Sequence, residues 1–238
     1  MQNTVPRPPA AHRQLADLTP RQQLSAGRTG RRVVQLFLGL ILYGWSMGMM
    51  IRSTLGLDPW DVFHDGVVGR TSLSFGTVVI LVSILVLLLW IPLRQWPGLG
   101  TLCNAMVIGV VTDLSLALLI QPDSLAVRLP LLVGGVVLNG LAGALYIGSQ
   151  FGAGPRDGLM TGLVRRTGRS IRLVRTGLEL SVLGIGWLLG GTVGIGTALY
   201  ALAIGPLVQL FLPYCVVELP ETDPGARRDS AVRGEDDR

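Results

Sequence analysis

The sequence predicts an all-α membrane protein. We expect a polytopic bundle of about six transmembrane helices in a 3+3 inverted repeat, with a short amphipathic or re-entrant helix in each copy. Three observations carry this prediction. The 238-residue chain is 49% hydrophobic and only 15% charged, which is not the composition of a soluble domain. Residues 39–114 match residues 135–210 at a constant offset of 96 without a gap. The arginines are distributed very unevenly among the loops.

The duplication is visible in identical residues at equivalent positions. Matching pairs include Gly44 and Gly140, Gly56 and Gly152, Pro59 and Pro155, Asp61 and Asp157, Gly98 and Gly194, and Thr101 and Thr197. Each copy holds three apolar runs, and an odd number forces the second copy to enter the bilayer in the opposite orientation. Inverted repeats recur in secondary transporters, where the substrate site lies between the halves.

Six apolar runs have the length of a transmembrane helix. Each has roughly 18–23 residues, enough for a hydrocarbon core of about 30 Å. The predicted spans are 33–51, 75–93, 100–120, 129–149, 173–190 and 193–215. The domains that follow are a disordered Arg-rich cytoplasmic arm at 1–32, a first membrane repeat at 33–120, an outer loop at 121–128, a second membrane repeat at 129–215, and a polar cytoplasmic tail at 216–238.

The basic residues predict the orientation of the chain. All 20 of them are arginine, and six spans place 17 on one side of the membrane, leaving only Arg52, Arg70 and Arg128 on the other. The positive-inside rule then puts both termini in the cytoplasm. Topology accounts for the basic charge, so no nucleic-acid partner is expected. The predicted partners are the lipid bilayer, a small solute or ion, and a second copy of the chain in a homodimer.

A polar, patterned segment joins the first two spans of each copy. Apolar residues recur at helical spacing in both segments, which predicts two amphipathic helices of about ten residues. The shared Gly-x-x-Pro-x-Asp pattern has an ordinary explanation as a helix start. Pro59 and Pro155 then take the first helical position, Asp58 or Gly154 takes the N-cap, and the following aspartate meets the positive helix end.

Two placements of these linker helices remain open. They can dip back into the membrane from opposite faces and bring their N-termini to a shared cavity, where protein or water lines the irregular backbone. They can also lie flat on each interface with the apolar stripe toward lipid. The copies differ in charge, because Asp58, Asp61 and His64 of the first align with Gly154, Asp157 and Met160 of the second, and Trp60 aligns with Arg156. Asymmetric charge on a symmetric scaffold suits a directional pathway, but the positive-inside rule alone also explains the arginines of the second copy.

Ionisable residues inside predicted spans are candidates for function because each is costly in lipid. Asp113 has no basic neighbour within one helical turn in sequence, so it must find a partner on another helix, face water or be protonated. It is therefore a candidate proton or cation site or, alternatively, an interhelical hydrogen bond. Its counterpart in the second copy is Gln209. Glu179 follows Arg175 by four residues, which predicts an ion pair on one helix.

The sequence contains no constellation typical of an enzyme. His64 is the only histidine outside the arm, and no Ser or Cys has an acid–base partner at motif spacing. Cys103 and Cys215 lie in different apolar runs, so no metal ligand set is predicted. We therefore expect no enzymatic activity, no cofactor and no metal. Candidates for a substrate or ion pathway are Asp58, Asp61, His64, Arg156, Asp157, Asp113 and Gln209.

The paired linkers also carry a resemblance to a known family. Residues 56–66 read Gly-Leu-Asp-Pro-Trp-Asp-Val-Phe-His-Asp-Gly and residues 152–162 read Gly-Ala-Gly-Pro-Arg-Asp-Gly-Leu-Met-Thr-Gly, with Gly-Ile-Gly-Thr at 194–197 and Ile-Gly-Pro at 204–206. Over residues 33–215 the chain resembles the YczE branch of the YczE/YyaS/YitT family of bacterial integral membrane proteins. The resemblance implies a multi-pass protein of the bacterial plasma membrane and supplies no substrate or mechanism.

The sequence leaves two function classes. The first is a small-solute transporter or permease-like protein with its site between the two inverted repeats. The second is a non-transporting membrane scaffold or accessory subunit. Burial of the linker helices discriminates between them, because re-entrant helices around a polar cavity favour transport and helices lying flat on a packed bundle favour a scaffold.

Overall fold

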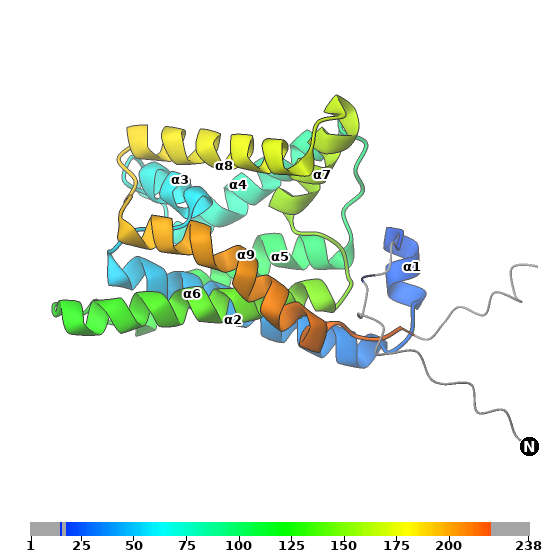
Figure 1. Cartoon of the computed structure of the whole chain (residues 1–238), viewed down its shortest axis with the longest axis horizontal. Helices are drawn as coiled ribbons and strands as arrows, with labels where there is room; N and C mark the ends of the chain where they lie inside the picture. The colour runs from blue at the N-terminus through cyan, green and yellow to red at the C-terminus, as the bar shows by residue number, and fades with distance from the viewer. Residues whose placement is uncertain (1–14, 16–17, 220–238) are drawn as a thin grey trace, which may run out of the picture.

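The computed structural model describes residue 15 and residues 18–219, which form helices and no strand (Figure 1). Most of the predicted arm and tail, at 1–14, 16–17 and 220–238, lies outside the described residues. The helices are α1 (Pro20–Ser25), α2 (Thr29–Ser53), α3 (Pro59–Val68), α4 (Phe75–Trp90), α5 (Leu99–Leu118), α6 (Leu125–Gly148), α7 (Pro155–Thr167), α8 (Ile171–Leu188) and α9 (Ile195–Cys215). The prediction of an all-α chain is confirmed.

Each predicted span corresponds to one helix. Helices α2, α5, α6 and α9 are long and apolar enough to cross a membrane. Helix α4 is apolar but has only 16 residues. Helix α8 has 18 residues and carries Arg172, Arg175 and Glu179 in its first half. Four spanning helices therefore have structural support, and the count of six stays a prediction for α4 and α8.

The structure differs from the prediction at residues 18–32, where we expected disorder. A capping box between Thr19 and Gln22 starts α1, and α2 begins at Thr29. The physical reason is Arg32, whose buried guanidinium donates to the carbonyl oxygens of Gln23 (2.7 Å), Ser149 (2.9 Å) and Gln150 (2.8 Å). These bonds tie the start of α2 to the loop that follows α6.

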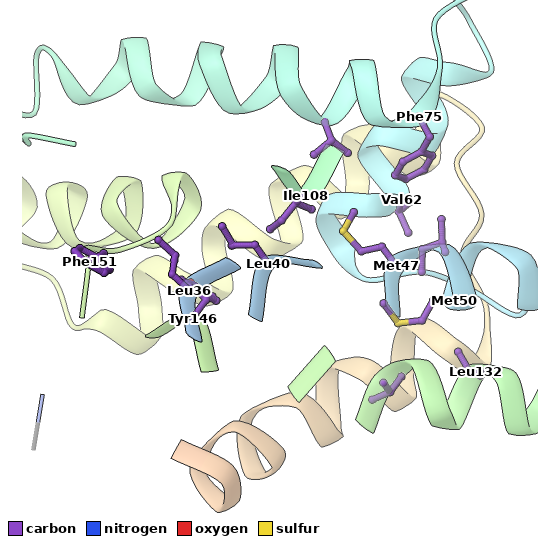
Figure 2. Close-up of a cluster of buried hydrophobic side chains, with 13 residues drawn as sticks. Leu36, Leu40, Met47, Met50, Val62, Phe75, Ile108, Leu132, Tyr146 and Phe151 are labelled. Atoms are coloured by element: carbon purple, nitrogen blue, oxygen red, sulfur yellow. The ribbon is translucent and has the colours of Figure 1, made fainter. Parts of the chain in front are cut away.

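Helices α2 and α6 occupy equivalent positions in the two copies and run side by side along one edge of the bundle (Figure 1). Helix α5 packs on α2, and its counterpart α9 packs on α6. Much of the hydrophobic core lies along α2, where Leu36, Leu40, Met47 and Met50 are buried (Figure 2). The outer surface exposes many large apolar side chains, as expected for a surface that lipid covers.

The two copies exchange equivalent contacts. The amide of Gly100 at the start of α5 donates to the carbonyl of Phe151 (2.9 Å), and the amide of Gly196 at the start of α9 donates to the carbonyl of Leu55 (2.8 Å). Leu55 and Phe151 are equivalent at the offset of 96, as are Gly100 and Gly196. Each linker loop therefore anchors the third helix of the other copy.

The linker helices are exchanged in the same way. Helix α3 packs on α8, where Gly186 lies against the backbone of Val62 and Phe63. Helix α7 packs on α4, where the ring of Trp90 lies against Gly158 and its indole N–H donates to the carbonyl of Pro155 (3.0 Å). Each linker helix thus packs on the second helix of the opposite copy.

Both linker helices begin as the sequence predicts. Pro59 and Pro155 occupy the first turn, after the N-caps Asp58 and Gly154. The preceding loops turn at Gly56 (φ +116°) and Gly152 (φ +108°), a backbone conformation that side chains disfavour. Buried residues along α3 and α7 show that one face of each helix packs against the bundle.

Candidate functional site

A cavity of about 320 Å³ lies where the N-termini of α3 and α7 meet, and residues of every helix from α2 to α9 line it. Sixteen of its lining residues form pairs that are equivalent at the offset of 96. The pairs are Tyr43 and Asn139, Asp58 and Gly154, Pro59 and Pro155, Trp60 and Arg156, Val79 and Arg175, Ser83 and Glu179, Asn104 and Tyr200, and Ile108 and Ile204. The cavity therefore lies between the two copies.

Asp58 lies at the N-terminus of α3 and points its carboxylate at the helix amides. Its Oδ1 accepts hydrogen bonds from the backbone N–H groups of Trp60 (2.9 Å) and Asp61 (3.1 Å). Its Oδ2 has no hydrogen-bond partner among the described residues, although the side chain is buried. Gly154, the counterpart of Asp58, has no side chain to cap α7.

Arg156 joins the two linker helices. Its guanidinium extends from the first turn of α7 to within 3.8 Å of Asp58 Oδ1 and 3.6 Å of Asp61 Oδ1. It also lies over the ring of Trp60, 5.0 Å from the centroid. In the described part of the chain, Arg156 is the only arginine in ion-pair contact with either aspartate. We call Asp58, Asp61, His64 and Arg156 the charge cluster.

His64 does not add a second positive charge to the cluster. Its Nδ1 lies 3.0 Å from Asp61 Oδ1, and both side chains are fully buried. Burial, and to a lesser extent the positive charge of Arg156, together lower the pKa of His64 to about 3, against the opposing effect of Asp58. The imidazole is therefore neutral near pH 7. A neutral ring with its proton on Nδ1 can donate to Asp61.

The two carboxyl groups favour their protonated forms. Burial raises the pKa of Asp58 to about 7, the charge of Asp61 raises it too, and Arg156 opposes the shift. Burial likewise raises the pKa of Asp61, again against Arg156. The groups lie within hydrogen-bonding reach of each other once one carries a proton. One arginine balances one carboxylate, so the cluster is neutral when the pair holds one proton.

Polar side chains from the spans complete the cavity wall. Tyr146 donates from its hydroxyl to Asp157 Oδ2 (2.7 Å), and its ring meets that of Tyr43 edge to face with centroids 6.3 Å apart. The hydroxyl of Tyr200 donates to Asn139 Oδ1 (3.1 Å). The wall thus combines aromatic rings with amide and carboxylate oxygens around the charge cluster.

The structure brings most of the predicted site residues together. Asp58, Arg156, Asp157 and Gln209 line the cavity, as do Pro59 and Pro155. Asp61 and His64 do not line it but lie buried beside Asp58 and Arg156. The charge cluster therefore combines Asp58, Asp61 and His64 of the first copy with Arg156 of the second.

Asp113 lies elsewhere, at the contact between α5 and α4. Its Oδ2 accepts from the hydroxyl of Ser74 (2.5 Å) and its Oδ1 from the amide of Gly76 (2.7 Å). Of the two explanations left open, the structure has the interhelical hydrogen bond. The predicted ion pair of Arg175 and Glu179 is also present, at 2.9 Å.

Sequence reasoning missed the spanning residues of the cavity wall. Asn104, Asn139 and Tyr200 are polar residues of predicted spans, which are more often helix contacts than ligands. Tyr43 and Tyr146 carried no motif. A signal was present, because Tyr43 aligns with Asn139 and Asn104 aligns with Tyr200, so that polar residues occur at equivalent depths in both copies. The described residues contain no group of three or more His, Cys, Asp or Glu side chains placed to hold a metal ion.

Comparisons with known proteins identify the family of the chain. The family of unknown function DUF6198 matches residues 30–213. An uncharacterized protein of Haemophilus influenzae is 42% identical over 74% of this chain and 81% of its own length. The uncharacterized membrane protein YczE of Bacillus subtilis is 33% identical over 83% of this chain and 92% of its own length. The uncharacterized protein YyaS of Bacillus subtilis is 29% identical over 74% and 90%, respectively. No solved structure matches.

Proposed function

Since the chain belongs to the family of unknown function DUF6198, we propose its function from its own cavity: it transports a small solute across the membrane. The chain is a membrane protein, as its similarity to YczE and its long apolar helices indicate. The observation that carries the proposal is the buried charge cluster beside a polar cavity that equivalent residues of both copies line. A binding site between two repeats is the arrangement that alternating access requires.

The two copies form an inverted repeat in this proposal. Three spans in each copy turn the second upside down relative to the first, so α3 and α7 enter the bundle from opposite sides. The exchanged contacts of Leu55 with Gly196 and of Phe151 with Gly100 support a two-fold relation between the copies. Rocking of one copy against the other then opens the cavity alternately to each side of the bacterial plasma membrane. The arginine distribution supports an orientation with both termini in the cytoplasm.

The charge cluster couples a proton to this movement. One arginine faces two buried carboxylates, so a proton or another cation must balance the second carboxylate. A positively charged solute can replace the proton and leave the cluster neutral. A solute without positive charge cannot replace it, so in that case the proton is transported together with the solute. Asp58 is the residue that exchanges the proton with the solute, because it lines the cavity, whereas Asp61 and His64 are buried and do not line it.

Two features favour transport over a scaffold or an enzyme. The linker helices pack against the bundle and point their N-termini at a polar cavity, which is the outcome that favours transport. Among the described residues that line the cavity, none pairs a nucleophile with an adjacent base.

Cysteine accessibility tests the proposal. On a Cys103→Ser/Cys215→Ser background, Ser83→Cys and Met160→Cys place single thiols in the cavity wall. We expect a membrane-impermeant maleimide to label each position in right-side-out and in inside-out vesicles, because the cavity opens to each side in turn. Leu202→Cys is the control, since this exposed apolar position lines no cavity and faces lipid. Labelling from one side only, or from neither, would contradict transport.

A further inference from the structure

The two copies differ in how their second and third helices pack. In the first copy α4 lies closely on α5, because a Cβ on Gly109 would come within 2.5 Å of the carbonyl oxygen of Gly76. Asp113 reinforces the contact by accepting from Ser74 and Gly76. At that contact backbone lies against backbone, so a solute cannot pass between α4 and α5 into the cavity.

The second copy lacks this contact. Arg172 stands at the position of Gly76, so α8 cannot approach α9 as closely. Gln209 stands at the position of Asp113 and offers one amide oxygen, not a carboxylate, to accept hydrogen bonds from α8. A Cβ on Gly205, the counterpart of Gly109, would meet no atom within 4 Å. Accordingly α8 does not pack closely along α9 in the part of the chain that the structure describes.

The cavity reaches the protein surface at this place. Its wall includes Arg175 and Glu179 of α8 and Gly205 and Gln209 of α9, and among them Arg175 and Gln209 are exposed and Glu179 is partly exposed. We call these four residues the lateral mouth. Large apolar side chains of the same two helices, such as Leu202, are exposed nearby in sequence, which indicates that lipid surrounds the mouth.

The depth of the mouth suits the headgroup region of a bilayer. Arg175 and Glu179 lie four and eight residues after the start of α8, or about 6 and 12 Å along the helix at 1.5 Å per residue. Their ion pair is costly against hydrocarbon and is tolerated where polar headgroups reach it. The arginine distribution places this end of α8 at the cytoplasmic leaflet.

The interior of the cavity selects a cation. Asp58 lines the cavity with its Oδ2 unpartnered, and a protonated amine can donate to this oxygen. Carboxylates outnumber arginines in the cavity wall, where Asp58, Asp157 and Glu179 occur with Arg156 and Arg175. Tyr43, Tyr146 and Tyr200 lie in the same wall, and aromatic rings attract cations.

We propose that a cationic amphiphile enters through the lateral mouth from the cytoplasmic leaflet, that its ammonium headgroup binds Asp58 in exchange for a proton, and that its chain remains in lipid. The amine arrives protonated and replaces the proton of the carboxyl pair, which leaves to water, so charge balances. This inference rests on the proposed function and names its substrate class.

Protection of Asp58 from a hydrophobic carbodiimide tests it. The reagent modifies protonated carboxyl groups in apolar surroundings, and mass spectrometry of the protein in lipid nanodiscs locates the adduct. The probes are decylammonium, ethylammonium and decanesulfonate. We expect decylammonium to protect Asp58 at a concentration at least about tenfold lower than ethylammonium, because its chain concentrates it in the bilayer. Decanesulfonate should give no protection.

A matched pair of variants tests the route. Gly205→Trp fills the mouth, and Gly184→Trp adds the same side chain to α8 at a glycine that also has open space but lines no cavity. We expect Gly205→Trp to raise the protecting concentration of decylammonium at least about tenfold, as a blocked entry would, and Gly184→Trp to leave it unchanged. Modification of Asp58 by the carbodiimide at the wild-type rate, measured without any amine, shows that a variant is folded.

Other outcomes overturn the inference without ambiguity. Equal protection by ethylammonium and decylammonium would mean that small cations enter from water, so the proposed function would stand and lateral entry would fail. Protection by decanesulfonate would contradict selection of a cation. A dimer that Gly205→Trp dissociates would mean that a second copy covers the mouth. The cysteine-labelling experiment tests the proposed transport function separately.

Discussion

Gly186→Val should abolish folding of the protein. A Cβ at this position would lie 2.5 Å from the backbone nitrogen of Phe63 and 2.6 Å from its Cα, and backbone atoms of α3 cannot move aside as a flexible side chain can. Helix α3 would have to separate from α8, which also displaces the charge cluster. We expect a loss of more than about 4 kcal/mol in the free energy of unfolding, as overpacking against backbone requires.

Gly184→Val is the matched control for this prediction. It lies two residues away on the same helix, and a Cβ there meets nothing within 4 Å. We expect it to change stability by no more than about 1 kcal/mol, since only helix propensity is altered. Monodisperse yield in detergent and the midpoint of thermal unfolding provide the measurements. Similar behaviour of the two variants would contradict the packing of α3 on α8.

Arg156→Met should destabilise the protein by on the order of 3 kcal/mol, because it leaves two buried carboxyl groups without a cation. The remaining aspartates must then both be protonated near pH 7 or attract another cation. Asp58→Asn should be much milder, since it leaves Asp61 and Arg156 as a balanced pair. The triple variant Arg156→Met/Asp58→Asn/Asp61→Asn should recover much of the loss, because no buried charge remains in the cluster.

The control for Arg156→Met is Arg175→Met. Arg175 also forms an ion pair with a carboxylate, at 2.9 Å from Glu179, but both side chains are exposed in the protein. An exposed pair contributes at most about 1 kcal/mol, so the variant should unfold close to the wild-type temperature. Thermal unfolding of all variants in one detergent gives the comparison. Equal losses for Arg156→Met and Arg175→Met would show that the charge cluster is not buried as described.

Local sequence accounts for the features that were predicted correctly. A proline at the first helical position, an aspartate two residues after it and a glycine in the preceding loop mark where α3 and α7 begin, and all lie within a few residues of one another. The ion pair of Arg175 and Glu179 depends only on the spacing of one helical turn. The apolar runs indicated where the long helices lie, because a run of apolar residues can be recognised in the sequence without knowing what it packs against.

The charge cluster could not be predicted because its members come from different copies. Arg156 lies 98 residues after Asp58 and meets it only because α3 and α7 point their N-termini toward one another. For Asp113 the sequence left open a proton or cation site and an interhelical hydrogen bond, and only the packing of α4 shows that Ser74 and Gly76 donate to it. The role of a polar residue in a span depends on the helix it faces, and the packing of the helices decides that.

Infrared spectroscopy of the carboxyl groups tests most directly whether the cluster holds an exchangeable proton. Because burial raises the pKa of Asp58 to about 7, the folded protein should show the carbonyl band of a protonated carboxylic acid at pH 6 and lose it with a midpoint near pH 7. Asp58→Asn and Asp61→Asn should each remove the band, since one carboxylate then pairs with Arg156. Asp113→Asn should leave the band in place. A band that persists in Asp58→Asn and Asp61→Asn but disappears in Asp113→Asn would contradict the proposal and return the proton to Asp113.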